Sequence, residues 1–459
     1  MLGRVVPSTT LLLVASELVL LSSIYIFTVY IVADIDPLVW LIYENGFIRI
    51  GFLVAGLMFG LYLQDLYSKF AVRQRFYLFQ QVCLVVGLAF LFQAAIAYGQ
   101  PALLLPRWIM IVGSMIVLVV LPAWRVLYSH MVTQTEKAEK ILFLGANEAA
   151  LAVARAIRDR PELRMNPIGL VVEEEPAGPV DGLPVLGTLD TFRAVVAAQK
   201  PDRIVVGLTE RRHKLPVLDL MDLNFSGTLV EDAATTFEQV FLRVCVPQLR
   251  PSQLIFSREI GVRAWNRNLQ NVYSGVLAAA GLVLAAPVMA IVGVLVKLTS
   301  SGPVLYRQER VGLNGVPFTI YKFRSMRQDA EAVTGAVWAA KDDPRITKFG
   351  KFIRRTRLDE LPQLFNVIRG EMSIVGPRPE RPEFVRQLSE KIPFYRQRHF
   401  VKPGVTGWAQ INHKYGDTIE DTITKLEYDL YYIKNLTPAL DFYILFHTIK
   451  VMLLSRGSQ

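Results

Sequence analysis

The chain has 459 residues, of which 52% are hydrophobic and only 20% are charged, and its formal net charge is +10. This length allows two or more domains, and the apolar composition argues against a disordered chain and against an ordinary soluble enzyme. Two cysteines exclude a disulfide framework and a cysteine-rich zinc module. An apolar and basic chain indicates either a membrane protein that handles anions or a nucleic-acid binder, so the position of the charge must decide.

The charge is distributed unevenly. Residues 1–130 hold 7 Lys or Arg and 5 Asp or Glu, residues 131–251 hold 14 and 17, and residues 252–459 hold 29 and 18. The three net charges are therefore +2, −3 and +11. Three compositions predict three functional units with these bounds.

The first unit contains four apolar runs, near 9–31, 46–64, 77–98 and 104–128. Each run is long enough for one membrane-spanning helix, so we predict a four-helix transmembrane domain. The loop at 65–76 is basic, whereas the loop at 32–45 is acidic and has no Lys or Arg, which predicts that both ends of this unit are cytoplasmic. Glu17, inside the first run, is either a functional site or a paired or interface-facing glutamate.

Residues 131–251 show the alternation of strands and helices that is typical of a small Rossmann-like α/β domain. Strands are predicted at 140–146, 168–172 and 203–208, with helices at 148–160 and 189–199. A dinucleotide site requires Gly-x-Gly-x-x-Gly after the first strand, and the corresponding residues are Gly145, Asn147 and Ala150. Because two glycines are missing, we expect a scaffold or regulatory domain without a cofactor.

The third unit begins with an uncharged run, Val272–Val296, that is long enough to span a membrane. Crossing would carry the basic C-terminal region outside, against the positive-inside bias, and Pro287 near the centre would kink a helix. We therefore predict a re-entrant helix hairpin over 272–298, broken at Pro287, that dips into the cytoplasmic leaflet and returns. A fifth, kinked span is the alternative.

A carboxylate pair lies inside a basic cluster, Arg354-Arg-Thr-Arg357-Leu-Asp359-Glu360-Leu-Pro362. Because proline is tolerated in a first helical turn, the pair is predicted at a helix start, where free N–H groups favour phosphate. Two adjacent carboxylates suit Mg²⁺, which usually shares its shell with substrate phosphates. Arginine contacts phosphate with two prongs, and the neighbouring prolines restrict the backbone around Arg378.

The segment from about 270 to 454 resembles the bacterial sugar transferase family, the monotopic phosphoglycosyl transferases. The resemblance is carried by the Pro-broken hydrophobic run and by four motifs: Lys322-Phe-Arg324-Ser-Met, Leu358-Asp-Glu-Leu-Pro-Gln363, Gly376-Pro-Arg-Pro379 and Pro403-Gly-Val-Thr-Gly-Trp-Ala-Gln410. The N-terminal helices and the Rossmann-like unit resemble the large subgroup, which includes undecaprenyl-phosphate galactose or glucose phosphotransferases. The resemblance implies a membrane helical bundle, a Rossmann-like α/β domain, and a mixed, mainly α catalytic domain with a re-entrant membrane helix.

The resemblance also implies a reaction, the transfer of a sugar-1-phosphate from a UDP-sugar to undecaprenyl phosphate with release of UMP. Such a reaction initiates exopolysaccharide, capsule or O-antigen synthesis. By similarity Asp359 is the nucleophile that carries the phosphosugar, and Glu360 helps to hold Mg²⁺ or assists proton handling. The expected phosphate or nucleotide contacts are Lys322, Arg324, Arg354, Arg357, Arg378 and Lys414. Asp429 either joins them or pairs with an arginine.

The implied location is the bacterial inner membrane, with the middle and catalytic domains on the cytoplasmic side. The expected partners are the UDP-sugar, undecaprenyl phosphate and the lipid bilayer, together with a homodimer through the N-terminal units. No nucleic acid is expected, because the basic region adjoins a membrane segment. The competing hypotheses are a non-enzymatic membrane scaffold that binds nucleotide sugar, and an epimerase or dehydrogenase that uses the middle domain.

Overall fold

The computed structural model describes most of the chain. The described residues are 8–33, 36–64, 66–67, 75–135, 138–160, 163–174, 179–208, 215–249, 264–327, 343, 345–413 and 418–453. The N-terminal helices, the middle sheet and the C-terminal elements follow one another along the chain.

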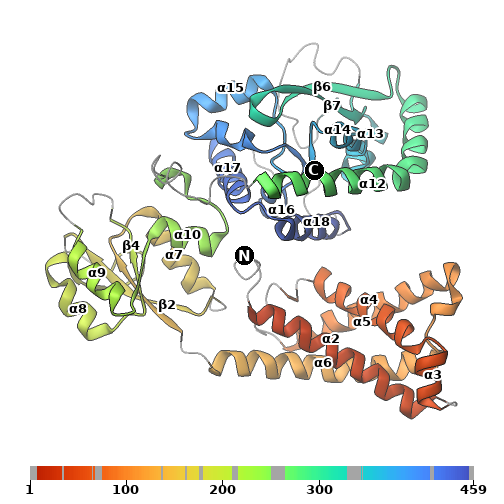
Figure 1. Ribbon diagram of the computed structural model, residues 1–459, viewed down its shortest axis with the longest axis horizontal. Helices are drawn as coiled ribbons and strands as arrows, with labels where there is room; N and C mark the ends of the chain where they lie inside the picture. The colour runs from red at the N-terminus through yellow and green to blue at the C-terminus, as the bar shows by residue number, and fades with distance from the viewer. Residues whose placement is uncertain are drawn as a thin grey trace. The chain divides into compact units, whose positions relative to one another are not determined.

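The N-terminal part is helical, as predicted (Figure 1). Its elements are α2 (Ser8–Val32), α3 (Pro37–Tyr43), α4 (Gly46–Leu63), α5 (Arg75–Gly99), the 3-10 helix η1 (Pro101–Leu103) and α6 (Arg107–Thr135). The four predicted runs coincide with α2, α4, α5 and α6. By length and composition α2, α4 and α6 can cross a membrane, and α5 contains a shorter apolar segment, Leu78–Ala94.

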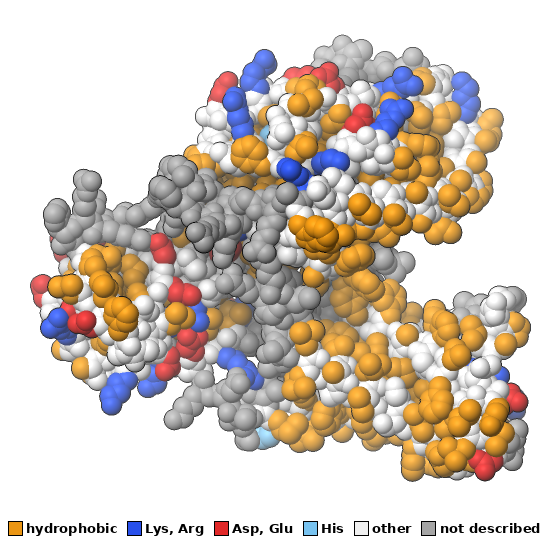
Figure 2. All heavy atoms as spheres, viewed as in Figure 1, with side chains coloured by type: hydrophobic (Ala, Val, Ile, Leu, Met, Phe, Trp, Pro, Cys, Tyr) orange, Lys and Arg blue, Asp and Glu red, His pale blue; other side chains and the backbone are white. Residues whose placement is uncertain are grey.

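These helices bury one apolar face and expose another. Leu21, Leu57, Val85 and Leu121, from four different helices, belong to one buried cluster. Hydrophobic side chains also cover much of the outside of the bundle, as Figure 2 shows. An apolar outer surface of this extent suits lipid rather than water.

Glu17 is fully buried and paired. Arg125 of α6 places its Nε 2.7 Å from one carboxylate oxygen of Glu17, and its Nη2 donates to the other at 2.9 Å. The same guanidinium donates to the Leu66 carbonyl and lies over the Tyr67 ring. Of the two alternatives for Glu17, the structure shows the paired one.

The middle part is a five-stranded sheet of order β3-β2-β1-β4-β5, which is the Rossmann order without its sixth strand (Figure 1). The strands are β1 (Glu139–Leu144), β2 (Met165–Val172), β3 (Val185–Thr188), β4 (Arg203–Val206) and β5 (Leu229–Asp232). The helices are α7 (Glu148–Asp159), α8 (Phe192–Gln199), α9 (Val217–Phe225) and α10 (Ala233–Phe241). β2 pairs with β3 and β4 pairs with β5 in parallel. The sequence predicted β1, β2 and β4 but neither of the edge strands, which are only four residues long.

The C-terminal part is mainly helical, with two small two-stranded sheets. Its first elements are α12 (Ala264–Thr299), β6 (Leu305–Val311), η5 (Leu313–Gly315), β7 (Pro317–Phe323), α13 (Lys348–Arg355), η6 (Leu358–Glu360) and α14 (Gln363–Ile368). They are followed by β8 (Ser373–Val375), α15 (Pro382–Lys391), η7 (Tyr395–Phe400), β9 (Gly404–Thr406), α16 (Trp408–Asn412), α17 (Ile419–Lys434) and α18 (Pro438–Leu453). β6 and β7 form an antiparallel hairpin, and β8 pairs with β9 in parallel.

α12 is one helix of 36 residues with Pro287 inside it. Its first half packs through Ala278 into a cluster with Val367 of α14, and its second half packs through Val292 against Phe323 of β7. Figure 1 shows that the helix changes direction sharply within its length. Both halves therefore lie against the same domain.

This helix differs from the predicted hairpin. It begins at Ala264 rather than at Val272, and helical structure continues through Pro287 instead of breaking there. A proline removes one hydrogen bond and displaces the preceding turn, which bends a helix but does not end it when tertiary packing holds both sides. Between its polar ends, much of the remaining surface of the helix is apolar and exposed, as Figure 2 shows along the edge of this domain. Its most exposed apolar residues include Val276, Val283, Leu284, Ile291 and Leu298.

Candidate functional site

The acidic pair lies on a tight turn between two helices. α13 begins after Thr347, whose side-chain oxygen accepts from the Gly350 N–H at 2.9 Å as an N-cap. Arg357 then takes φ 55, a left-handed conformation that costs a non-glycine residue about 1–3 kcal/mol. The 3-10 turn η6 carries Asp359 and Glu360 immediately before α14. The predicted position of the pair, at a helix start, is confirmed.

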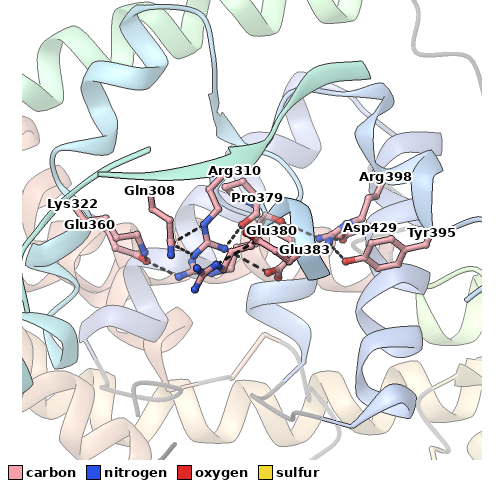
Figure 3. Close-up of polar contacts among 12 residues, drawn as sticks. Gln308, Arg310, Lys322, Glu360, Pro379, Glu380, Glu383, Tyr395, Arg398 and Asp429 are labelled. Carbon is pink, nitrogen blue, oxygen red and sulfur yellow. Dashed lines mark hydrogen bonds and ion pairs between the residues drawn. The ribbon is translucent and has the colours of Figure 1, made fainter. Parts of the chain in front are cut away.

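Three cationic side chains surround the carboxylate of Glu360. Lys322 Nζ lies 3.0 Å from Oε1, and Arg378 Nη2 donates to the same oxygen at 2.7 Å. Arg357 Nη1 lies 3.6 Å from Oε2, beyond hydrogen-bonding distance. The structure therefore brings together residues from β7, from η6 and from the loop before α15, and Figure 3 shows Lys322 and Glu360 pointing toward each other.

The two adjacent carboxylates differ in electrostatic state. Burial would raise the pKa of Glu360, but the charges of Arg378 and Lys322 outweigh it and hold that pKa well below its ordinary value. Burial and the negative charge of Glu360 raise the pKa of Asp359 to about 6. Lys322, Arg354 and Arg378 lower the pKa of Asp359 but do not cancel the rise. The basic cluster thus leaves Asp359 largely ionised at neutral pH, although its pKa lies closer to neutral than that of an exposed aspartate.

Asp359 is also unengaged. It is 8% exposed, and within the described residues no hydrogen bond or ion pair occupies its carboxylate. A buried, mostly ionised and unpaired carboxylate beside a cluster of cations is suited to attack an electrophile that carries its own negative charge.

The Gly376–Pro379 and Pro403–Gln410 motifs are hydrogen-bonded to each other next to Arg378. The Gly376 N–H donates to the Thr406 carbonyl at 2.8 Å, and the Gly404 N–H donates to the Pro377 carbonyl at 2.9 Å. A Cβ on Gly376 would lie 2.4 Å from the Lys402 carbonyl oxygen, and one on Gly404 would lie 2.1 Å from the Gly376 nitrogen. Only glycine permits this approach, so the two motifs fix the start of the Arg378 loop together.

A second polar network supports the far side of the same loop (Figure 3). Arg310 of β6 donates to Gln308 Oε1 at 3.1 and 2.6 Å and to the Pro379 carbonyl at 3.1 Å. Its Nη1 lies 3.6 Å from the carboxylate of Glu380. These contacts attach the loop to the β6–β7 hairpin that also carries Lys322.

Asp429 pairs with an arginine, one of the two alternatives expected for it. It is 1% exposed, and Arg398 donates to its carboxylate from Nε at 3.1 Å and from Nη2 at 2.7 Å. Arg398 Nη2 also donates to the backbone carbonyl of Arg378 at 3.1 Å, and Nη1 donates to the Tyr395 hydroxyl. Asp429 therefore reaches the acidic pair only through Arg398 and the Arg378 backbone (Figure 3).

Of the other predicted contact residues, Arg324 contacts the C-terminal end of α12 and Arg354 lies on α13. Arg324 is buried, and its guanidinium donates to Ser300 and to the Pro303 carbonyl at the C-terminal end of α12, so it anchors that helix. Arg354 is half-buried on α13, close enough for its charge to lower the pKa of Asp359. Lys414 lies outside the described residues.

Four residues that support the Arg378 loop were not predicted from the sequence: Gln308, Arg310, Glu380 and Arg398. Gln308 and Arg310 alternate along β6, and this period of two could have indicated one shared face. Glu380 directly follows the Gly-Pro-Arg-Pro motif. Arg398 carries no local signal for its contacts with Asp429 and the Arg378 carbonyl, which are 31 and 20 residues away in the chain.

The acidic pair offers part of a Mg²⁺ shell. Glu360 Oε1 is held by two cations, whereas Oε2 and the Asp359 carboxylate accept no hydrogen bond within the described residues. Those residues contain no group of three or more His, Cys, Asp or Glu that could hold a metal. Mg²⁺ commonly takes one or two carboxylates and completes its shell with water and substrate phosphates, and the pair fits a metal of that kind.

Two family models match the chain. Residues 265–455 match a family described as bacterial sugar transferase, and this range contains every residue of the site. Residues 58–215 match a family described as CoA-binding domain.

Individual relatives extend over more of the chain. The UDP-glucose:undecaprenyl-phosphate glucose-1-phosphate transferase of Xanthomonas campestris pv. campestris is 36% identical over 334 residues, which cover 69% of this chain and 67% of the relative. The protein of the same name from Escherichia coli (strain K12) is 35% identical over 322 residues, 66% of this chain and 68% of the relative. The UDP-N-acetylgalactosamine-undecaprenyl-phosphate N-acetylgalactosaminephosphotransferase of Aeromonas hydrophila is 44% identical over 217 residues, 47% of this chain. The match covers 50% of that last relative's length.

Proposed function

Because the chain belongs to the bacterial sugar transferase family, we propose that it transfers a sugar-1-phosphate from a UDP-sugar to undecaprenyl phosphate and releases UMP. The names of the relatives support both the nucleotide-sugar donor and the polyprenyl acceptor. The observation that carries the proposal is the contrast between Glu360, held ionised by three cations, and its buried, unpaired neighbour Asp359. The reaction would initiate a surface polysaccharide such as an exopolysaccharide, a capsule or an O-antigen.

We propose that Asp359 is the nucleophile. A carboxylate oxygen of Asp359 forms a bond to the sugar-linked phosphorus while the bond to the bridging oxygen breaks, and that oxygen leaves with UMP. A phosphate oxygen of the lipid then forms a bond to the same phosphorus, the bond to Asp359 breaks, and the carboxylate is restored. All three species are anhydrides, two of them diphosphates and the aspartyl phosphate a mixed carboxylic–phosphoric anhydride, so each exchange replaces one anhydride bond by another, and two anionic substrates never meet directly.

The basic side chains would bind the phosphates. Lys322, Arg357 and Arg378 already converge on Glu360, and Arg354 lies on the helix that leads into the pair. In this proposal they neutralise the diphosphate and the departing UMP. Of the other expected contacts, Arg324 would act by anchoring α12 and Asp429 through Arg398. A nucleotide contact from Lys414 remains a prediction.

Mg²⁺ would be held by Asp359 and by Oε2 of Glu360, together with the donor diphosphate. When bound, it supplies positive charge that offsets the charge on the diphosphate. Glu360 remains fixed by Lys322 and Arg378, so its second oxygen is held in position for this role.

We propose a site on the cytoplasmic face of a bacterial inner membrane. α12 exposes an apolar surface along most of its length, and both of its halves return to the same domain. A helix that enters one leaflet and returns would satisfy both features, and it would bring the site to the depth at which a lipid phosphate lies. A homodimer through the N-terminal helices remains a prediction.

The proposal can be tested with purified protein and a panel of UDP-sugars. We expect Mg²⁺-dependent UMP release with undecaprenyl phosphate, and retention of a radiolabelled phosphosugar on the protein when the lipid is omitted. Chelation with EDTA should abolish both signals, and added Mg²⁺ should restore them.

Asp359→Asn should lose turnover and labelling together, whereas Glu390→Gln, an exposed substitution on α15, should retain both. Wild-type turnover in Asp359→Asn would refute the nucleophile. Absence of UMP release with every sugar would instead favour a scaffold that binds nucleotide sugar without reacting.

A further inference from the structure

A cofactor of the middle domain would be expected in the crevice of the Rossmann-like sheet. The strand order reverses between β1 and β4, and ligands of such sheets bind there, outside the carboxyl ends of the strands. The loop after β1 contains Gly145 and Asn147, and the loop after β4 contains Gly207. The match to a family described as CoA-binding domain makes this crevice the expected cofactor site.

The two loops close directly on each other. The Asn147 N–H donates to the Gly207 carbonyl at 3.0 Å, and a Cβ on Gly207 would lie 2.6 Å from the Cβ of Ala150. Asn147 Oδ1 accepts from the Ala150 N–H at 2.9 Å, which caps the first turn of α7. A pyrophosphate would bind free N–H groups of that turn, and here the Ala150 N–H is already bonded to the Asn147 side chain.

A segment of the same chain covers this closed crevice. Residues 242–249, which follow α10 and are called here the coupling segment, place Gln248 Oε1 3.1 Å from the Asn147 side-chain amide. Within this segment, the side chains of Cys245 and Val246 are buried. Burial, then the charges of Glu427 and of Glu148 at the start of α7, raise the pKa of the Cys245 thiol to about 11. The thiol thus lies within electrostatic reach of α7 on one side and α17 on the other.

The opposite side of the coupling segment is bonded to α16 and α17. The backbone N–H of Val246 donates to Glu427 Oε1 at 3.1 Å, and that of Val244 donates to the Glu427 carbonyl at 3.1 Å. Arg243 Nη1 lies 3.4 Å from Glu427 Oε2. Trp408, in the Pro-Gly-Val-Thr-Gly-Trp motif, donates its indole N–H to the Leu242 carbonyl at 2.9 Å.

We propose that the coupling segment is the built-in occupant of the crevice, so that the middle domain binds neither CoA nor a dinucleotide there and instead docks on the catalytic domain through Glu427 and Trp408. The residues present do not suit a cofactor, because the Ala150 N–H is bonded to Asn147, the two loops are bonded to each other, and the Asn147 side-chain amide is bonded to Gln248. This inference does not depend on the proposed reaction.

The first test is hydrogen exchange of the full chain in detergent, with and without saturating CoA or NADH. We expect no change in the exchange of peptides that contain residues 145–150 and 207–208, whatever happens at the basic active site. Protection of those peptides by either compound would overturn the proposal.

The second test uses variants on each side of the coupling segment. Glu427→Ala removes the acceptors of its side chain, and exchange of residues 244–249 and 145–150 should become about tenfold faster. Glu420→Ala, on the exposed start of the same helix, should leave the exchange of both segments unchanged. Asn147→Ser keeps an acceptor for the helix cap but loses the donor to Gln248, and exchange of residues 246–249 should rise. Unchanged exchange in folded Glu427→Ala and Asn147→Ser proteins would overturn the proposal.

Discussion

Asp359 and Glu360 are consecutive residues with the same charge, yet their surroundings act on them in opposite ways. Glu360 takes the contacts of the local cations, whereas Asp359 keeps a pKa of about 6 and no partner within the described residues. Because like charges destabilise each other at this distance, the protein holds a strained ionised carboxylate at the point where chemistry would occur.

This contrast predicts opposite effects on stability at pH 7.5. The pKa of Asp359 is raised from its ordinary value, so its ionised form opposes folding by up to about 3 kcal/mol, and Asp359→Asn should raise the thermal unfolding midpoint. Glu360→Gln should lower the midpoint, with a loss of about 1–3 kcal/mol of unfolding free energy, because it leaves Lys322 and Arg378 without their anion. Thermal unfolding in detergent measures both. A lower midpoint for Asp359→Asn would contradict the prediction.

The same pKa predicts how the first half-reaction depends on pH. Asp359 must be ionised to attack, so its active form is fully present above its pKa of about 6 and is lost as the pH falls below it. Single-turnover UMP release without lipid should therefore fall about tenfold per unit below pH 6 and level off above pH 7. Omitting the lipid avoids the titration of its phosphate. A flat profile from pH 5 to 8 would contradict a pKa of about 6 for the attacking carboxylate.

At the scale of elements, the site depends on loops held from several directions. The Arg378 loop is attached to β9 through Gly376 and Gly404, to β6 through Arg310, and to α17 through Arg398 and Asp429. None of these contacts touches the acidic pair, so they act by positioning the guanidinium of Arg378.

We predict that Asp429→Asn disturbs substrate binding more than the chemical step. Arg398 would lose its charged partner and release the Arg378 carbonyl, so KM for the UDP-sugar should rise about tenfold while kcat changes less. Arg398→Lys should have a similar effect on KM, because lysine cannot bridge the Asp429 carboxylate and the Arg378 carbonyl. Glu420→Gln on the same helix serves as the control. A fall in kcat alone would place Asp429 in direct contact with the reacting groups.

At the scale of the whole molecule, the direction of α12 sets where the catalytic part lies. If the helix re-enters one leaflet, its two ends emerge on the same side of the membrane. In a background of Cys83→Ser and Cys245→Ser, single cysteines at Arg267 and Ser301, both exposed, should react with an impermeant maleimide only after the inner membrane is opened. A cysteine at Glu44, in the loop predicted outside, should react in intact spheroplasts. Labelling of one end of α12 from outside would show that the helix crosses.

Much of this architecture was predictable because its signals are local. Runs of apolar residues predicted α2, α4, α5 and α6, and the alternation of strands and helices predicted the central strands of the sheet. The two edge strands were missed because each is short and only partly buried, with mixed apolar and polar residues, whereas the equally short β4 is fully buried and mainly apolar. The sequence also placed Pro287 within an apolar helix, but only packing of both halves of α12 on one domain decides that the helix bends and continues.

The sequence by itself determined the apolar helices, the alternation of strands and helices, and the position of Asp359 and Glu360 at a helix start, because hydropathy, periodicity and proline chemistry act over a few residues. It could not determine which residues meet. Only the tertiary structure decided that Arg324 anchors a helix, that Asp429 acts through Arg398, and that Gln248 lies against Asn147. The physical reason is that each of these contacts joins residues between 20 and 101 positions apart, and the partner of a buried polar group is chosen by the fold rather than by its neighbours in the chain.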